Sequence, residues 1–295
     1  MKVAIYGIKV NSFTIVTFKE LFKLLARFNW TPVLEVNLKK LLSDKIAEVD
    51  AMATFADHHD LKNGFGLLIS LGGDGTFIDS VGFIRDSQVP IIGINAGRLG
   101  FLANISKDHI EAALQKIHDK EYELQVRSLL RIKMNNTILG EDNFALNEVS
   151  LHKRDTSSMI TVHAELEGKY LNSYWADGLI VATPTGSTAY SLSCNGPIVT
   201  PGCKVHILTP IAPHNLNVRP MVVPDHMPIR LTVEGRVRRY LVSIDGKSHV
   251  IQKGEELIIE KAEFTINVIK FEGNNFLDTI RNKMLWGIDK RNLNK

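Results

Sequence analysis

The sequence predicts a two-domain protein, in which an α/β domain of the doubly wound type is followed by an all-β domain. Over residues 1–121, short apolar runs alternate with amphipathic stretches of helical spacing, the pattern of alternating strands and helices. Over residues 122–271, most apolar runs are short, alternating and β-branched, and Gly, Pro, Asn and Asp separate them. Residues 272–295 contain one more stretch of helical spacing, which we expect to form a C-terminal helix that packs back on the first domain.

The first domain is expected to be Rossmann-like, with buried parallel strands between helices. The run Leu67–Leu71 is continuously apolar and stops at Gly72, which is typical of a parallel strand covered on both faces. Strands are expected at Val3–Tyr6, Val33–Val36, Leu67–Leu71 and Pro90–Ile94, and helices at Thr14–Asn29, Leu38–Val49, Thr76–Arg85 and Lys107–Glu121.

The second domain shows the period of two that half-buried strands require. Strands are expected at Leu129–Met134, Met159–Leu166, Ile229–Val233, Tyr240–Ile244, Leu257–Ile259 and Phe264–Ile269. The C-terminal helix is expected over Phe276–Trp286, because its apolar residues fall close to helical spacing.

The composition is that of a globular protein with a sizeable core, since 44% of the 295 residues are hydrophobic and 23% are charged. The net charge of +3 is small and the basic residues are scattered, so we expect no nucleic-acid partner. The densest basic group, Arg236, Arg238 and Arg239, has the spacing of a solvated strand face.

Cysteine content and hydropathy indicate the compartment. Two cysteines, Cys194 and Cys203, are too few for a disulfide framework and are consistent with a reducing environment. No apolar run approaches the roughly 20 residues that span a bilayer, and the N-terminal run is interpreted as a strand and not as a signal peptide. We therefore expect a soluble, cytoplasmic protein with no membrane partner.

The first chemical motif is the turn Gly72-Gly73-Asp74-Gly75-Thr76, between a buried strand and a helix. Glycines let the main chain approach a ligand, and the start of the helix offers free N–H groups to a phosphate. Asp74 would repel a phosphate unless it has another task, which could be to hold Mg²⁺, to accept a proton from an attacking hydroxyl, or simply to cap the helix. Neither a Rossmann fingerprint nor a Walker loop is present, so a kinase of this kind would hold phosphates mainly by glycine-rich backbone and not by a dedicated loop lysine.

Two further stretches carry polar groups beside apolar runs. In the loop from Gly93 to Phe101, Arg98 could bind a phosphate and Phe101 could pack against a base. Alternatively, the stretch could be a long strand-to-helix connection with Phe101 in the core. Asn147 and Glu148 interrupt a strand-like stretch. A carboxylate beside a carboxamide can hydrogen-bond to a ribose diol or to the edge of an amide group. A solvent-facing strand residue beside a turn residue explains the second pair equally well.

The longest motif runs from Ala176 to Ser193 and reads ADGLIVATPTGSTAYSLS. An acidic turn leads into an apolar strand, and a small, hydroxyl-rich loop then opens toward a helix. Small residues allow a ligand to lie close to the backbone, and hydroxyls orient it without adding charge. A helix cap would explain one or two of these hydroxyls but not five.

These four stretches, in this order, resemble the hallmarks of the NAD kinase family. GGDGT alone is shared with lipid kinases and phosphofructokinases, whereas the DGL…TPTGSTAY run together with NE is specific. The resemblance covers residues 67–245 and implies Mg²⁺-dependent phosphoryl transfer from ATP, or from polyphosphate, to the 2′-hydroxyl of the adenosine ribose of NAD. It also implies a homo-oligomer, a dimer or a tetramer.

The resemblance assigns a role to each matched position. Asp74 would contact the ribose and act as base or orienting group, and Gly75 would let the backbone approach the dinucleotide. Asn147 and Glu148 would bind the pyridine dinucleotide, and Asp177 would hold its other end. The remaining implied site residues are Phe101, Thr185, Thr188, Ala189, Tyr190, Ser191, Leu192, Ser193, Ala212 and Asp245, the last of them near the triphosphate.

Two positions depart from the family pattern, since Trp175 stands where many relatives carry a basic residue and Lys247 where some carry glutamine. Both affect contacts at the rim of the site. Two other functions stay open at this point. A lipid kinase of the diacylglycerol type shares GGDGT, and a non-catalytic dinucleotide sensor would keep Asp177 and the hydroxyl loop without needing Asp74.

Overall fold

The computed structural model describes residues 1–62, 64–95, 97, 100–137, 139–141, 143–154, 159–236, 238–273 and 275–286. The chain divides into two compact units. The first unit contains Met1–Val126 and the chain from Ile266 onward, and the second contains Arg127–Thr265. Among the described residues, no helix combines the length and the apolar character that crossing a membrane requires.

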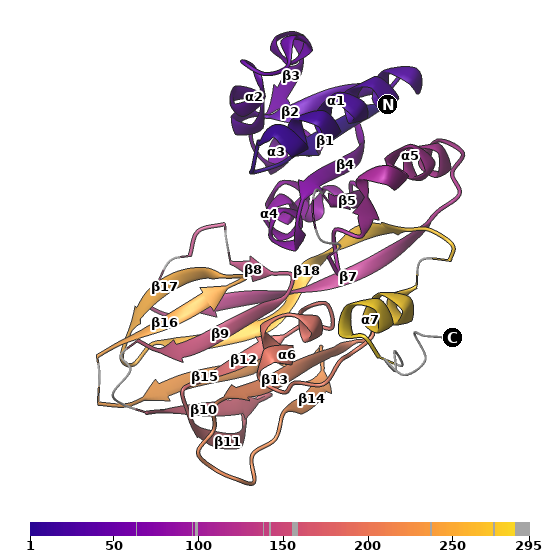
Figure 1. Cartoon of the computed structure of the whole chain (residues 1–295). Helices are drawn as coiled ribbons and strands as arrows, with labels where there is room; N and C mark the ends of the chain where they lie inside the picture. Colours follow the sequence, from indigo (N-terminus) through magenta and orange to yellow (C-terminus); the bar gives the residue numbers. More distant parts are fainter. Residues whose placement is uncertain are drawn as a thin grey trace. The chain divides into compact units, whose positions relative to one another are not determined.

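The first unit is built on a parallel sheet with the strand order β5-β4-β1-β2-β3 (Figure 1). The strands are β1 (Lys2–Tyr6), β2 (Thr31–Glu35), β3 (Ala53–Phe55), β4 (Phe65–Gly72) and β5 (Ile91–Asn95), with a short β6 (Ile105–Ser106) beside β5. The chain runs outward from β1 through β2 and β3 and then returns to the other side of β1 as β4. Such a reversal leaves a crevice at the carboxyl ends of the two central strands, where open α/β sheets bind ligands.

Helices cover this sheet and complete its core. They are α1 (Ser12–Arg27), α2 (Val36–Leu42), α3 (His58–Leu61), α4 (Asp74–Ile84), α5 (Ile110–His118) and α7 (Phe276–Met284). The buried face of α1, with Phe18, Leu21 and Leu25, packs in one cluster with the sheet residues Ile5 and Ile69. Because α7 belongs to this unit, the C-terminal helix returns to the first domain as predicted.

Helix ends are where the sequence and the structure differ in this unit. The helix predicted over Leu38–Val49 ends at Leu42, and a 3₁₀ turn at Ala47–Ala51 follows. Ser43 and Asp44, which favour turns, separate the two. Ile46 and Val49 are buried nevertheless, so the apolar spacing continued past the true end of the helix. The helix predicted from Thr76 begins two residues earlier, at Asp74.

The second unit is built mainly of β-strands, as predicted, with the short helix α6 (Tyr190–Ser193), and contains two antiparallel sheets (Figure 1). One has the order β11-β10-β15-β18, with β10 (Ile160–Leu166), β11 (Lys169–Ala176), β15 (Ile229–Glu234) and β18 (Glu256–Lys270). The other has the order β14-β13-β12-β9-β16-β17, with β9 (Glu148–Lys153), β12 (Gly178–Ala182), β13 (Val205–Ile211), β14 (Met221–Pro224), β16 (Arg239–Ile244) and β17 (Lys247–Gln252). Side chains of both sheets form one hydrophobic cluster, which includes Leu151, Leu179, Val242, Val162 and Leu231.

Strand β18 is one continuous strand where the sequence predicted two. The charged residues between the two apolar runs do not interrupt the strand, and Glu260 and Glu263 pair with Lys133 and Arg131. Lys133 and Arg131 lie on β7 (Glu123–Met134), which also pairs with β8 (Phe144–Ala145). A strand with exposed, paired charges on one face needs no interruption.

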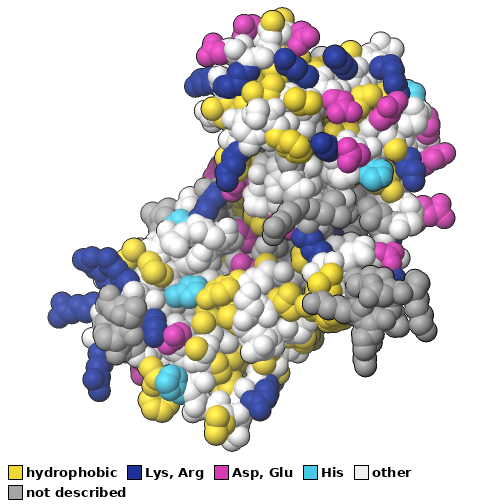
Figure 2. All heavy atoms as spheres, in the orientation of Figure 1, with side chains coloured by type: hydrophobic (Ala, Val, Ile, Leu, Met, Phe, Trp, Pro, Cys, Tyr) yellow, Lys and Arg dark blue, Asp and Glu magenta, His cyan; other side chains and the backbone are white. Residues whose placement is uncertain are grey.

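The basic residues singled out in the sequence, Arg236, Arg238 and Arg239, lie at one turn. Arg236, Arg238 and Arg239 are exposed at the turn between β15 and β16, so they are solvated as predicted, although two of them lie in the turn. On the face shown in Figure 2, dark blue side chains gather at the end of the second unit where Figure 1 labels β17, and elsewhere they are interspersed with acidic ones.

Candidate functional site

A cavity of about 490 Å³ opens at the carboxyl ends of β1 and β4 in the first unit. Its walls come from the loop after β1, with Lys9 and Asn11, and from the glycine-rich turn after β4. Asn95 and Gly97, at the end of β5, also line it. The strand order reverses between β1 and β4, so the cavity occupies the crevice that this topology creates.

The glycines of the turn have different reasons to be there. A Cβ on Gly72 would lie 2.3 Å from Thr76 Oγ1, so the turn can close only without a side chain at that position. A Cβ on Gly73 or Gly75 would meet nothing within 4 Å, so glycine there leaves the cavity open. Gly73 is the N-cap of α4 and makes no side-chain cap, which leaves the first N–H groups of the helix available to an anion.

Asp74 is the first residue of α4, and its carboxylate holds the loop after β5. Oδ2 accepts the N–H of Phe101 at 2.8 Å, and Oδ1 accepts those of Leu102 and Ala103, both at 2.9 Å. A Cβ on Gly100 would lie 1.8 Å from Oδ1, so glycine is required for this close approach. A carboxylate offers about four acceptor positions, so one position on Oδ2 is left for a further donor.

Phe101, which was predicted to pack against a base, is half-buried. The ammonium of Lys283 lies 5.1 Å from the centre of its ring. Because Lys283 lies on α7, the returning C-terminal helix contacts the loop that Asp74 holds. Such a contact is a cation–π interaction. Arg98, predicted to meet a phosphate in the same loop, lies outside the described residues.

In the second unit, Asp245 repeats the arrangement of Asp74. Its carboxylate accepts the N–H groups of Leu146, Asn147 and Glu148, at 2.6, 2.9 and 3.0 Å. The acidic turn therefore holds the segment that leads into β9, where the predicted site residues Asn147 and Glu148 lie. The implied role of Asp245 near a triphosphate stays a prediction, because all three of these contacts are to backbone.

Glu148 is a carboxyl group in a largely apolar setting. Burial, and to a lesser degree the neighbouring Asp245, raises the pKa of Glu148 to about 8, although the N–H of Tyr190 donates to it. Its Oε2 is buried and has no hydrogen-bond partner among the described residues. At neutral pH this side chain is therefore protonated and can both donate and accept a hydrogen bond.

The hydroxyl-rich loop owes its shape to its own side chains. Thr183 Oγ1 donates to the carbonyl of Leu146 at 2.5 Å and accepts the N–H of Gly186 at 3.1 Å. A Cβ on Gly186 would lie 2.1 Å from the carbonyl oxygen of Asn147, so the loop can pass there only with glycine.

Several of the predicted ligand hydroxyls have internal partners. Thr185 accepts from the buried Arg127, Thr188 donates to the carbonyl of Thr185, and Ser191 bonds Thr209. Thr185 and Ser191 are buried, whereas Ser193 is exposed. Sequence reasoning therefore did not foresee that the hydroxyls build the loop. Contact with a ligand stays a prediction for the group Thr185, Thr188, Ala189, Ser191, Leu192 and Ser193.

Tyr190 starts the short helix α6 (Tyr190–Ser193) and stacks on a residue that the sequence analysis did not single out. The rings of Tyr190 and His152 lie 5.7 Å apart at an interplanar angle of 23°. His152 Nε2 and Ser150 Oγ are 2.7 Å apart, and burial lowers the pKa of His152. The signal was available, since Glu148, Ser150 and His152 alternate along one face of β9.

The remaining predicted residues lie at the ends of neighbouring strands. Asp177 joins β11 to β12, and its carboxylate lies 2.5 Å from Lys153 Nζ. Ala212 follows β13 with a φ of +44°, a left-handed backbone that is uncommon outside glycine. Of the predicted site residues, Asp74, Gly75 and Phe101 thus belong to the first unit, and all others belong to the second.

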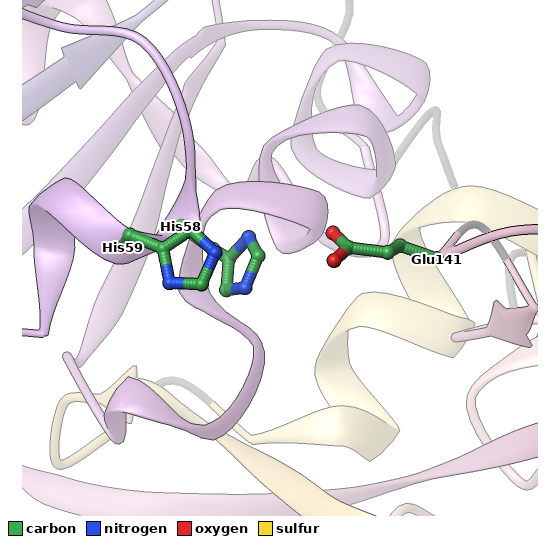
Figure 3. Close-up of side chains that lie close together, drawn as sticks. All are labelled: His58, His59 and Glu141. Carbon is green, nitrogen blue, oxygen red and sulfur yellow. The ribbon is translucent and has the colours of Figure 1, made fainter.

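Figure 3 shows three further polar side chains, His58 and His59 on α3 and Glu141 before β8. The two histidine rings are neighbours, with centres 3.9 Å apart. His58 and His59 belong to the first unit and Glu141 to the second, so we assign no metal site to them.

Comparison with known proteins gives a consistent result over both units. Residues 14–122 match the ATP-NAD kinase N-terminal domain, and residues 146–271 match the ATP-NAD kinase C-terminal domain. The chain is 46% identical to an NAD kinase of Flavobacterium psychrophilum and 47% identical to one of Flavobacterium johnsoniae, in each case over 99% of this chain and 100% of the relative.

Two solved structures have a similar fold. A yeast NADH kinase complexed with NADH has a TM-score of 0.88 and 22% identity, covering 98% of this chain and 88% of its own. An NAD kinase from Archaeoglobus fulgidus in complex with ATP has a TM-score of 0.75 and 28% identity, covering 97% of this chain and 99% of its own. The likeness extends over both units of this chain.

Proposed function

This chain belongs to the NAD kinase family, and we propose that it transfers the γ-phosphoryl group of ATP to the 2′-hydroxyl of the adenosine ribose of NAD, forming NADP. The observation that carries the proposal is the carboxylate of Asp74, which backbone N–H groups fix and which lies in sequence between Gly73 and Gly75, two glycines that line the cavity. Transfer of a phosphoryl group to an alcohol requires positioning, a group that orients the hydroxyl and charge stabilisation more than covalent chemistry.

Asp74 acts on the acceptor hydroxyl through Oδ2 in this proposal. Oδ1 is occupied by two N–H groups and Oδ2 by one, so a hydroxyl can donate to the remaining position on Oδ2. The bonds from Phe101, Leu102 and Ala103 keep the carboxylate in one orientation. A hydroxyl held in this way presents its oxygen to the phosphorus and can lose its proton to the carboxylate.

The pyridine dinucleotide is assigned to the second unit. Asn147 and the protonated Glu148 offer donors and acceptors to its ribose or amide groups, and Tyr190 offers the face of an exposed aromatic ring. Asp177 is assigned to the other end of the dinucleotide, where its carboxylate is already paired with Lys153. Ala212 offers its backbone at the edge of this region.

The donor is ATP with Mg²⁺, and the cavity of the first unit has side chains that fit a magnesium nucleotide. Mg²⁺ is commonly bound by one or two carboxylates together with substrate phosphates, and Asp79 is the carboxylate that lines this cavity. When bound there, the metal would spread the charge of the phosphates. Inorganic polyphosphate as an alternative donor, a homo-oligomeric state and a cytoplasmic location stay predictions from the resemblance.

A coupled assay tests the proposed function. The purified chain is given Mg²⁺-ATP and NAD, and NADP is detected with an NADP-specific dehydrogenase. We expect NADP to form, with one ADP for each NADP. Binding of NAD without turnover would instead favour the dinucleotide sensor, and phosphorylation of a diacylglycerol in the absence of NADP formation would favour a lipid kinase.

A further inference from the structure

Lys9 is a cation that the fold brings to the glycine-rich turn from a different loop. It lies two residues after Gly7, in the loop between β1 and α1, and lines the same cavity as Gly73 and Gly75. Its side chain is exposed, and it makes no hydrogen bond or ion pair within the described part of the chain. The sequence contains no lysine inside the GGDGT turn, so reasoning from that motif alone could not find it.

The other polar side chains of this wall already have partners. Asn11 and Thr14 cap α1 reciprocally, because Asn11 Oδ1 accepts the N–H of Thr14 and Thr14 Oγ1 accepts that of Asn11. Asn95 Oδ1 accepts the N–H of Gly97. The ammonium of Lys9 is the cation among the described lining residues, and a ligand can engage it without breaking a structural contact.

Lys9 is the lining side chain of this cavity that favours an anionic ligand. Lys9 and Asp79 are the two charged side chains among the described residues that line it, and their formal charges cancel. Without Lys9, the described lining would carry only the negative charge of Asp79, which attracts a phosphate only through a bound metal ion. A compact ammonium with three donors binds phosphate oxygens well, as the lysine of a phosphate-binding loop does, although here it comes from a different strand end.

We propose that Lys9 binds the terminal phosphates of the nucleoside triphosphate donor in the cavity between β1 and β4. The proposal rests on the function proposed above and names the residue that replaces the missing loop lysine. The backbone of Gly73 and Gly75 allows the phosphates to approach, and Lys9 supplies the counter-charge. Lys9 therefore contributes to binding of the donor and not to binding of NAD.

The test compares Lys9→Gln with Lys40→Gln, which removes the same charge from an exposed lysine of α2 outside the cavity. KM is measured for ATP and for NAD in the coupled assay, and binding of tripolyphosphate is measured by calorimetry without NAD. Loss of a charge-assisted hydrogen bond should weaken ATP and tripolyphosphate binding about tenfold or more in Lys9→Gln. KM for NAD should stay within about twofold, and Lys40→Gln should match the wild type in every measurement.

Unchanged KM for ATP and unchanged tripolyphosphate affinity in Lys9→Gln would overturn the inference, and so would an equal loss in Lys40→Gln. Recovery of both affinities in Lys9→Arg would support it, because the charge returns with a different side chain. The calorimetric measurement needs no turnover. If the wild-type chain formed no NADP, the proposed function would fail, while tripolyphosphate binding would still decide the role of Lys9.

Discussion

At the scale of a single residue, the ionisation of Glu148 in the proposed dinucleotide site makes the free energy of unfolding depend on pH. Its pKa in the folded chain is raised to about 8, mainly by burial, from an ordinary value of 4.5. Between these two values, the folded chain holds a proton at Glu148 that the unfolded chain has lost. The free energy of unfolding should therefore fall as pH rises through this window, by at most about 1.4 kcal/mol per pH unit.

Glu148→Gln should remove this part of the pH dependence, because the amide is neutral in both states. Chemical denaturation of the wild type and the variant at several pH values between 5 and 8 measures the difference in slope. Glu20→Gln, at an exposed position of α1, should keep the wild-type slope. The assignment is wrong if Glu148→Gln and the wild type lose stability in parallel as pH rises.

His152 is predicted to position Tyr190 through ring stacking. His152→Ala removes the stacked ring and should raise KM for NAD about threefold to tenfold, with little change in kcat or in KM for ATP. His152→Phe keeps an aromatic ring and should restore most of the affinity, which a role based on charge or on the bond to Ser150 would not allow. Steady-state kinetics with each substrate varied in turn makes the comparison.

At the scale of elements, each unit fixes a loop by the same set of hydrogen bonds to one carboxylate. Asp74 holds residues 101–103 and Asp245 holds residues 146–148, in each case through three consecutive N–H groups and one carboxylate. In the second unit the held residues Asn147 and Glu148 are the ones assigned to the site, whereas in the first unit the assigned group is the carboxylate of Asp74 itself. The site is therefore fixed by hydrogen bonds between elements as well as by the packing of the sheets.

Asp245→Ala should strongly destabilise the second unit, because three backbone N–H groups lose their acceptor together. An unsatisfied buried donor costs about 1–3 kcal/mol, so we expect a loss of about 3 kcal/mol or more in the free energy of unfolding. Asp44→Ala, at an exposed turn, should change it by less than about 0.5 kcal/mol. Urea denaturation of the two variants measures both values, and similar small losses would mean that water replaces the carboxylate.

How far the sequence predicts these elements depends on whether the signal is local. The strands β1, β4 and β5 follow from short continuous apolar runs, and the helix α1 follows from apolar residues at helical spacing. The short β3 and α3 have too few residues for a period to be seen, and they were not predicted.

The candidate site was predictable in its motifs but not in its contacts. Asp74 and the amides that it holds are 27 to 29 positions apart. Lys9 lies after β1, far from the glycine-rich turn in sequence, and lines the same cavity as that turn. Pairings of this kind depend on strand order, which periodicity does not encode. The hydroxyls of Thr183 and Ser191 illustrate the same limit, because their partners Leu146 and Thr209 follow only from the fold.

At the scale of the whole molecule, the two units carry different parts of the proposed reaction. The first provides the donor cavity and Asp74, and the second provides the groups assigned to the dinucleotide. Two strands, β7 and β18, pass from one unit into the other, and the family matches cover both units. Activity should accordingly require the full chain.

The central claim is that Asp74 acts on the acceptor hydroxyl and does not only hold the loop after β5. The most direct test is kcat for NADP formation by Asp74→Asn and by Gly100→Ala. The alanine Cβ would collide with Oδ1 and disturb the contacts of the loop, but the carboxylate remains. Loss of general-base help predicts that Asp74→Asn lowers kcat by about 10²–10⁴, well beyond the effect of Gly100→Ala. Equal losses in the two variants would contradict the claim, because Asp74 would then act only through the loop.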